Sequence, residues 1–190
     1  MTKVRLELEK LEILRQKERW QLYFIVVAEH PTNPDQMIIT TLPEGYIRLK
    51  PQAGNIVPFE PEGDGNTEGL IVLERDMPEN RSLKVRLYLR HSRKTARDAG
   101  ALLQDIMDNL GGDAIGIVTD IMGKSTPWLA IAAKALPLIG QILTKIPDRD
   151  FGFVNMDEVF GDDFENQTEQ DRNNIFSSGD AKIVWCWSVS

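Results

Sequence analysis

Two short stretches of the chain combine residue types that could do chemistry. The first runs from Asp148 to Glu158 and reads DRDFGFVNMDE. Carboxylates at Asp148, Asp150 and Glu158, with Gly152 among them, approach a calcium loop, which uses alternating oxygen ligands, a glycine at the sharp turn and a closing glutamate. One ligand position is missing, because only Phe151 separates Asp150 from Gly152. We therefore favour a capped turn whose aspartates are solvated or pair with the arginine between them, and keep calcium at the three carboxylates as the alternative.

The second stretch is a basic cluster in an otherwise acidic protein. It follows a predicted strand and precedes a predicted helix, so it could receive a phosphate, a carboxylate or a partner at the helix N-terminus. A solvated loop offset by nearby acids is the simpler interpretation. The residues of this predicted anion or partner contact are His91, Arg93, Lys94 and Arg97.

Recognisable catalytic motifs are missing from the sequence. It contains no G-x-S-x-G, P-loop, HExxH or CxxC pattern. Cys186 stands between two tryptophans in a strand-like run, which favours a small buried or half-buried hydrophobe over a nucleophile. A hydrolase using carboxylates of the acidic segment is the remaining enzymatic alternative, and it would need a concave pocket at Asp157, Asp162 or Asp163. We predict a protein without catalytic residues or a resident cofactor.

The bulk composition limits the classes of partner. The chain has 190 residues, of which 42% are apolar and 27% charged, and this is typical of one soluble domain covering residues 1–190. Its formal net charge of −7 disfavours nucleic acid, because phosphate contacts need clustered Lys and Arg. The charged, alternating first residues lack the apolar core of a signal peptide, so we expect a cytoplasmic protein or one exported without a conventional leader.

Three long strands are predicted from hydrophobic periodicity. Within Leu83–Leu89 four aliphatic side chains alternate with charged residues and Tyr88, which places the aliphatics on one face of a strand. Val4–Ile13 alternates in the same way but slips phase near Glu9, which indicates a β-bulge. A charged amphipathic helix is the alternative for this stretch, because Glu and Lys favour helix. Trp20–Ala28 is apolar on both faces and β-branched, as expected for a central strand covered from both sides.

Turn residues separate the remaining predicted strands at intervals of 8–15 residues. Pro58 places its strand at a sheet edge, because proline donates no ladder hydrogen bond. These strands are Met37–Leu42, Tyr46–Lys50, Asn55–Phe59, Leu70–Arg75 and Ala181–Val189. The fold class is therefore mainly β: an antiparallel two-sheet β-sandwich of about eight strands with a helical insertion before the last strand.

The helical insertion is expected at about residues 95–146. Leucines and isoleucines at helical spacing precede Gly111–Gly112, and a short helix capped by Asp113 and a longer one over Trp128–Ile146, kinked at Pro137, follow. We expect a helical hairpin packed on the sandwich and no transmembrane segment, because charges and a proline interrupt the apolar run. The alternative is a bacterial toxin or effector that inserts the hairpin at residues 114–146 into membranes.

The order of segments resembles a C2-type β-sandwich. The carriers of this pattern are Val4–Ile13, Trp20–Ala28, the Glu29–Gln36 loop, Leu83–Leu89 and Ala181–Val189. Calcium-binding C2 domains have several aspartates in their apical loops, whereas the matching loops here hold only Asp35 and Asp98. The resemblance thus implies a calcium-independent variant that contacts protein or lipid, although a fold alone fixes no function. We expect a non-enzymatic binding module whose contact surfaces are the loops at one end of the sandwich and the acidic segment Asp157–Asp171.

Overall fold

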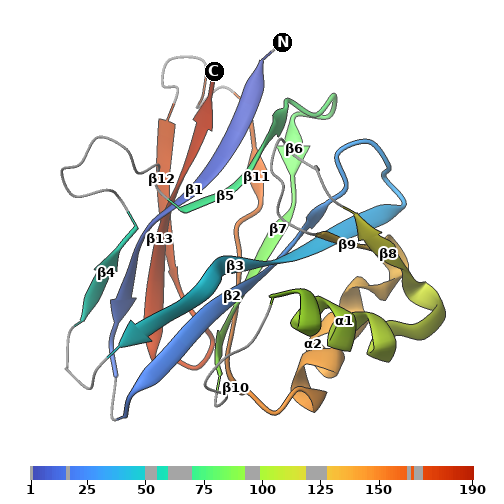
Figure 1. Ribbon diagram of the computed structural model, residues 1–190. Coiled ribbons are helices and arrows are strands. Elements are labelled where there is room, and N and C mark those ends of the chain that lie inside the picture. Colours follow the sequence, from blue (N-terminus) through green and yellow to red (C-terminus); the bar gives the residue numbers. More distant parts are fainter. Residues whose placement is uncertain are drawn as a thin grey trace.

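The computed structural model describes residues 2–15, 18–49, 55–59, 70–92, 99–118, 128–161, 164 and 169–190. Within this part of the chain lie thirteen strands and two α-helices. The strands form two antiparallel sheets and one small two-stranded sheet, and the helices pack beside one of the large sheets (Figure 1). The mainly β, sandwich-like class is confirmed, with more strands than the eight that the turn spacing predicted.

The first sheet, here the β1 sheet, joins the two ends of the chain. Its order is β12-β13-β1-β4, and β5 also pairs with β1. Register runs from Val4 opposite Val189 to Ile13 opposite Ala181, with a shift between Leu8 and Lys10 that confirms the predicted bulge. The strands are β1 (Lys3–Ile13), β4 (Ile56–Pro58), β5 (Leu70–Asp76), β12 (Glu169–Ile175) and β13 (Ala181–Val189). As Pro58 predicted, β4 lies at an edge.

The second sheet, here the β2 sheet, has the order β10-β7-β2-β3-β9-β8. Its strands are β2 (Trp20–Glu29), β3 (Gln36–Leu49), β7 (Val85–His91), β8 (Ala114–Val118), β9 (Trp128–Ala132) and β10 (Arg149–Asn155). The small sheet pairs β6 (Ser82–Leu83) with β11 (Glu158–Val159).

The central strand β2 separates two hydrophobic layers. Leu22, Phe24 and Val26 pack with the inner face of the β1 sheet. The alternate residues Tyr23 and Ile25 face the helices α1 (Ala99–Leu110) and α2 (Leu136–Lys145). Since β2 is buried on both sides, its continuous apolar run is explained, and the molecule has three layers of sheet, sheet and helix (Figure 1).

The Leu83–Leu89 pattern places its aliphatics as predicted, and all four are buried between the sheets. The other face was expected to carry solvated charges. Instead, Tyr88 and Arg90 are buried there as well, because α2 and the residues that follow it cover this side of β7. The burial of Arg90 is taken up below.

The predicted helical insertion is wrong in half of its elements. Residues 99–110 and 136–145 are helical, but Ala114–Val118 and Trp128–Ala132 are the strands β8 and β9, which extend the β2 sheet through pairing of β9 with β3. Five-residue apolar runs fit a strand or a helix equally well, and pairing with an existing sheet edge decides between them. Pro137 lies in the first turn of α2, where its missing N–H costs nothing, rather than at a kink. Strands β10 to β12 also separate the insertion from the last strand.

Within the described part of residues 114–146 there is therefore no continuous apolar helical hairpin. Among the described residues, no helix is both long enough and apolar enough to cross a membrane. The membrane-inserting alternative assumed a helical hairpin in this segment. The segment instead contributes two strands, β8 and β9, to the sheet.

Two strands predicted separately, over 37–42 and 46–50, form the single strand β3 within the described residues. Leu42 pairs with Phe24 and Ile47 with Leu22. Residues 43–46 of β3 therefore form an enlarged bulge opposite the single residue Tyr23. The turn residues Pro43 and Gly45 thus interrupt the register without ending the strand.

Candidate functional site

A groove lies between two turns at one end of the sandwich. This is the end at which both chain termini lie (Figure 1). We call this groove the end groove. Its volume is about 600 Å³, and it lies between residues 29–34 at the end of β2 and residues 75–80 at the end of β5. Because β2 and β5 belong to different sheets, stacking of the sheets brings these two turns together. Its lining is Glu29, His30, Pro31, Thr32, Asn33, Pro34, Arg75, Asp76, Met77, Pro78, Glu79 and Asn80.

Arg75 ties the two walls of the end groove to each other. Its Nη1 donates to the carbonyl of Glu29 at 3.2 Å and its Nη2 to that of Pro31 at 3.0 Å. Burial lowers the pKa of Arg75, and the neighbouring carboxylates of Glu29 and Asp76 oppose that shift. The guanidinium stays charged. Its Nη groups are directed at backbone carbonyls, so this side chain builds the groove.

His30 organises the loop on the other wall. Its Nδ1 accepts hydrogen bonds from the backbone N–H groups of Thr32 at 3.3 Å and Asn33 at 3.2 Å. Burial, and then the positive charge of Arg75, lower the pKa of His30 below its ordinary value. Both effects favour the neutral imidazole. Because Nδ1 accepts the two hydrogen bonds, the proton of the neutral ring is on Nε2. The nitrogen that could act as a base is already engaged by the loop.

The carboxylates of the end groove outnumber its positive charges. Glu29, Asp76 and Glu79 face one guanidinium, that of Arg75, which leaves a formal net charge of −2. These carboxylates do not gather around one point. Among the described residues, the group of three potential metal ligands within 4.8 Å of one another is Glu9, Asp171 and Cys186, which lies outside the groove. The groove therefore presents negative charge spread along its length, next to the apolar surfaces of its prolines and Met77.

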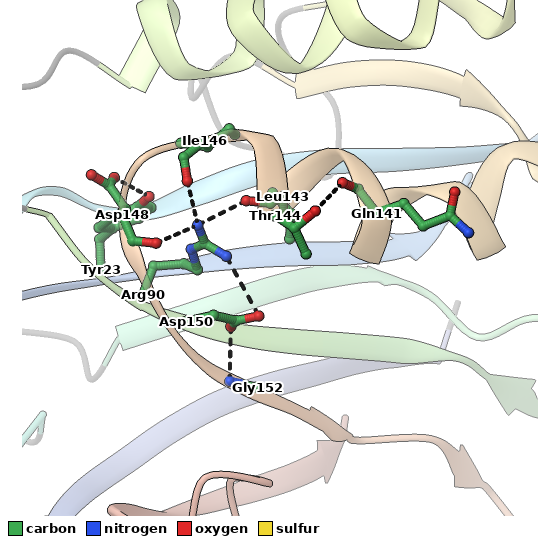
Figure 2. A network of polar contacts seen from close by, with 9 residues as sticks. All are labelled: Tyr23, Arg90, Gln141, Leu143, Thr144, Ile146, Asp148, Asp150 and Gly152. Atoms are coloured by element: carbon green, nitrogen blue, oxygen red, sulfur yellow. Dashed lines mark hydrogen bonds and ion pairs between the residues drawn. The ribbon is translucent and has the colours of Figure 1, made fainter.

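The three sequence-predicted calcium ligands have other partners, and Figure 2 shows those of Asp148 and Asp150. Asp148 accepts a hydrogen bond from the hydroxyl of Tyr23 at 2.7 Å. Asp150 accepts one from the N–H of Gly152 at 2.8 Å and pairs with Arg90 at 3.5 Å. Glu158 pairs with Arg172 at 3.2 Å.

Glu158 is also remote from the two aspartates. It stands opposite Leu83 in the small sheet, whereas Asp150 stands opposite Arg90 at the far end of β7. Strand rise separates those two positions by about 20 Å. The structure thus brings Asp148 and Asp150 to the same network but not Glu158, and calcium binding stays a prediction that a calorimetric titration would test.

Arg90 is the centre of that network and gave no signal in the sequence. Its side chain is fully buried, and its Nη2 donates to the carbonyls of Leu143, Ile146 and Asp148 at 2.9, 3.2 and 2.9 Å (Figure 2). The first two carbonyls lie at the C-terminal end of α2, where they also accept hydrogen bonds from the backbone N–H groups of Ile146 and Asp148. Arg90 thus fastens the C-terminus of α2 to the β2 sheet. Its positive charge is favourable there, because the C-terminus of a helix carries a partial negative charge.

The predicted anion contact can be placed only in part. His91 ends β7, is buried, and lies opposite Arg149 of β10. Arg93, Lys94 and Arg97 lie outside the described residues. Anion or partner binding by this cluster stays a prediction.

A second hollow of about 160 Å³ lies on the β1 sheet around Cys186. The bulge of β1 places Glu9 beside Cys186 and Asp171, and the ligand atoms of these three residues lie within 4.8 Å of one another. A thiol with two carboxylates could hold a divalent ion such as Zn²⁺. The sequence did not indicate this set, because its members come from three strands far apart in the chain.

The thiol itself is poorly reactive, as the sequence predicted. Burial, followed by the negative charge of Asp171, raises the pKa of Cys186 to about 12. The protonated thiol is half-buried and weakly nucleophilic at neutral pH.

Among the described residues of the acidic segment, no two carboxylates form a catalytic pair. Asp157 accepts a hydrogen bond from the N–H of Val85 at 3.0 Å, so it joins the strands. It borders a cavity of about 50 Å³. Asp162 and Asp163 lie outside the described residues, and the hydrolase alternative stays a prediction.

Comparison with known proteins gives little beyond the fold. No protein-family model matches the chain, and no curated protein matches it. A solved structure described as Drosophila C2-DSL-EGF1 aligns with 100% of this chain and 67% of its own, at a TM-score of 0.37 and 10% sequence identity. The likeness to a C2-containing structure is weak. It shows no family, and we base no argument on it.

Proposed function

We propose that this protein is a non-enzymatic binding module that holds a segment of a partner protein in the end groove. The observation that carries the proposal is the groove itself: about 600 Å³ between two turns that Arg75 joins through backbone carbonyls. A cavity of this size suits a short segment of chain, and its walls are preorganised.

The charges of the end groove favour a protein over an anionic lipid surface. Glu29, Asp76 and Glu79 would face the phosphates of such a surface and repel them. A calcium-independent mode of binding fits the same carboxylates, because they are spread out rather than gathered around one point.

The groove also offers little to a reaction. The single imidazole in its lining has Nδ1 occupied by two backbone N–H groups. A general base needs a free nitrogen or oxygen within reach of the substrate proton. Binding is therefore the activity that these residues support best.

Selection from a displayed library of random peptides tests the proposal. We expect enriched peptides to bind the protein and to lose at least tenfold in affinity to Thr32→Trp, because Thr32 is exposed in the groove lining and a tryptophan there fills the space. Thr144→Trp, at an exposed site on α2, is the matched control and should leave affinity unchanged. Enriched peptides that bind both variants like the unmodified protein, or no enrichment at all, would contradict the proposal.

A further inference from the structure

We infer that the segment recognised in the end groove is a basic, extended peptide, with Lys or Arg residues separated by apolar ones. This inference rests on the proposed function and adds the chemical class of the partner. Three features of the groove support it: the excess of carboxylates, their spacing, and the apolar surfaces between them.

The excess of carboxylates is a property of the finished fold. The one arginine of the lining directs both Nη atoms at the carbonyls of Glu29 and Pro31, and the one histidine has Nδ1 bonded to backbone N–H groups. The guanidinium is thus engaged by backbone carbonyls of the groove itself, and the imidazole, whose Nδ1 accepts these bonds, is neutral. Exposed Asp76 and Glu79, on the wall formed by residues 75–80, meet that ligand first.

The spacing of the carboxylates favours several separate cations over one ion. Residues that could share a metal bring their ligand atoms within about 5 Å, and among the described residues only Glu9, Asp171 and Cys186 do so. Glu29, Asp76 and Glu79 are spread over both walls instead. A peptide with basic side chains at intervals matches such a distribution, with each ion pair adding a modest amount to affinity.

Apolar surfaces fill the spaces between the charges. Pro31 and Pro34 lie on one wall, and Met77 and Pro78 on the other. Methionine adapts its shape to different side chains, and proline presents a rigid apolar face. A peptide of basic residues alone would leave these surfaces in water, so we expect apolar residues between the basic ones.

Fluorescence anisotropy with two synthetic peptides tests the inference. The first is a nonapeptide with lysine at every third position and leucine or proline between; the second has glutamate in place of each lysine. We expect the lysine peptide to bind at least tenfold more tightly than the glutamate peptide, and its affinity to fall as salt is raised.

Charge variants separate recognition by the groove from general attraction to an acidic protein. Glu29→Gln/Asp76→Asn/Glu79→Gln removes the groove carboxylates, and Asp105→Asn/Asp108→Asn/Glu169→Gln removes three exposed ones on α1 and β12. The net charge changes equally in both. We expect the groove variant to lose about tenfold in affinity for the lysine peptide and the control less than twofold. Equal losses, or no binding of the lysine peptide by the unmodified protein, would overturn the inference.

The library selection distinguishes this failure from failure of the proposed function. Enriched peptides that occupy the end groove but are not basic would overturn the inference and leave the binding function standing. Absence of any peptide that occupies the groove would overturn both. Thermal melting of each variant shows whether it is folded. Amide chemical-shift mapping on the unmodified protein shows, without any substitution, whether a peptide occupies the end groove.

Discussion

Arg90 places a permanent charge in a fully buried position, which proteins rarely accept without compensation. Here three backbone carbonyls and the carboxylate of Asp150 supply it. The side chain therefore acts as the fastening between the helical layer and the β2 sheet.

Removing this fastening should cost stability. We expect Arg90→Met to lower the free energy of unfolding by about 3 kcal/mol, because three buried carbonyls lose a charged donor and Asp150 loses its cation. Arg86→Met, on the same strand, removes one exposed hydrogen bond to Asn155 and should cost less than about 1 kcal/mol. Urea unfolding of the two variants measures the difference, and equal losses would contradict this role of Arg90.

His30 should make stability depend on pH in a defined direction. Its pKa is lowered in the folded state by burial and by Arg75, from an ordinary value of 6.5. The unfolded chain therefore binds a proton first as pH falls, so the contribution of His30 is complete above pH 6.5 and is lost below it. His30→Asn keeps a side-chain oxygen as acceptor but does not titrate.

Urea unfolding at several pH values between about 5 and 7.5 tests this sign. The unmodified protein should lose more stability on acidification than His30→Asn does. The comparison isolates His30, because His91 is present in both proteins. Parallel curves, or a steeper loss in the variant, would show that the folded state does not disfavour the imidazolium.

Cys186 should react slowly while the protein is folded. With the pKa of the thiol raised to about 12, the thiolate is a minute fraction at pH 8. We expect alkylation by iodoacetamide to be at least about a hundredfold slower in the folded protein than in urea, where the pKa returns to about 8.5. Mass spectrometry gives both rates, and similar rates would contradict the environment described for this thiol.

At the scale of elements, β10 depends on a glycine that interrupts its register. Gly152 has φ +88°, and a Cβ there would collide with the side chain of Ser177. The carboxylate of Asp150 accepts the N–H of Gly152 at the same irregularity, between Asp150 and Phe153. The DRDFG stretch that approached a calcium loop in sequence is, in the fold, a strand with a bulge.

A pair of glycine substitutions tests the conformation of β10. Gly152→Ala should lower the free energy of unfolding by about 1–3 kcal/mol, because alanine is strained at this φ. Gly161→Ala should change it by less than about 0.5 kcal/mol, since a Cβ there meets no atom within 4 Å. Differential scanning calorimetry compares them, and an equal effect of the two substitutions would argue against the positive φ at Gly152.

The elements predicted correctly are those with a long alternating or two-sided pattern. Val4–Ile13, Trp20–Ala28 and Ala181–Val189 are strands as expected, because each pattern repeats over a long run; for Val4–Ile13 the helical alternative is wrong. Ala114–Val118 and Trp128–Ala132 are too short for that. Their strand conformation comes from pairing: β9 pairs with β3, a partner distant in the sequence, and β8 pairs with β9.

At the scale of the whole molecule, the end groove shows what a sequence can indicate and what it cannot. Both turns that form it, after Glu29 and after Asp76, were recognisable from proline, asparagine and aspartate. Their proximity was not, because it depends on how two sheets stack. Arg75 carried no signal either, since its partners are backbone carbonyls, which every sequence has.

Amide chemical-shift mapping with a peptide from the library selection tests the central claim, binding in the end groove, most directly. We predict that the perturbed amides fall within residues 29–33 and 75–80, with the helices and the outer face of the β1 sheet unaffected. Perturbations centred on α1, α2 or the hollow around Cys186, with residues 29–33 and 75–80 unchanged, would contradict the account.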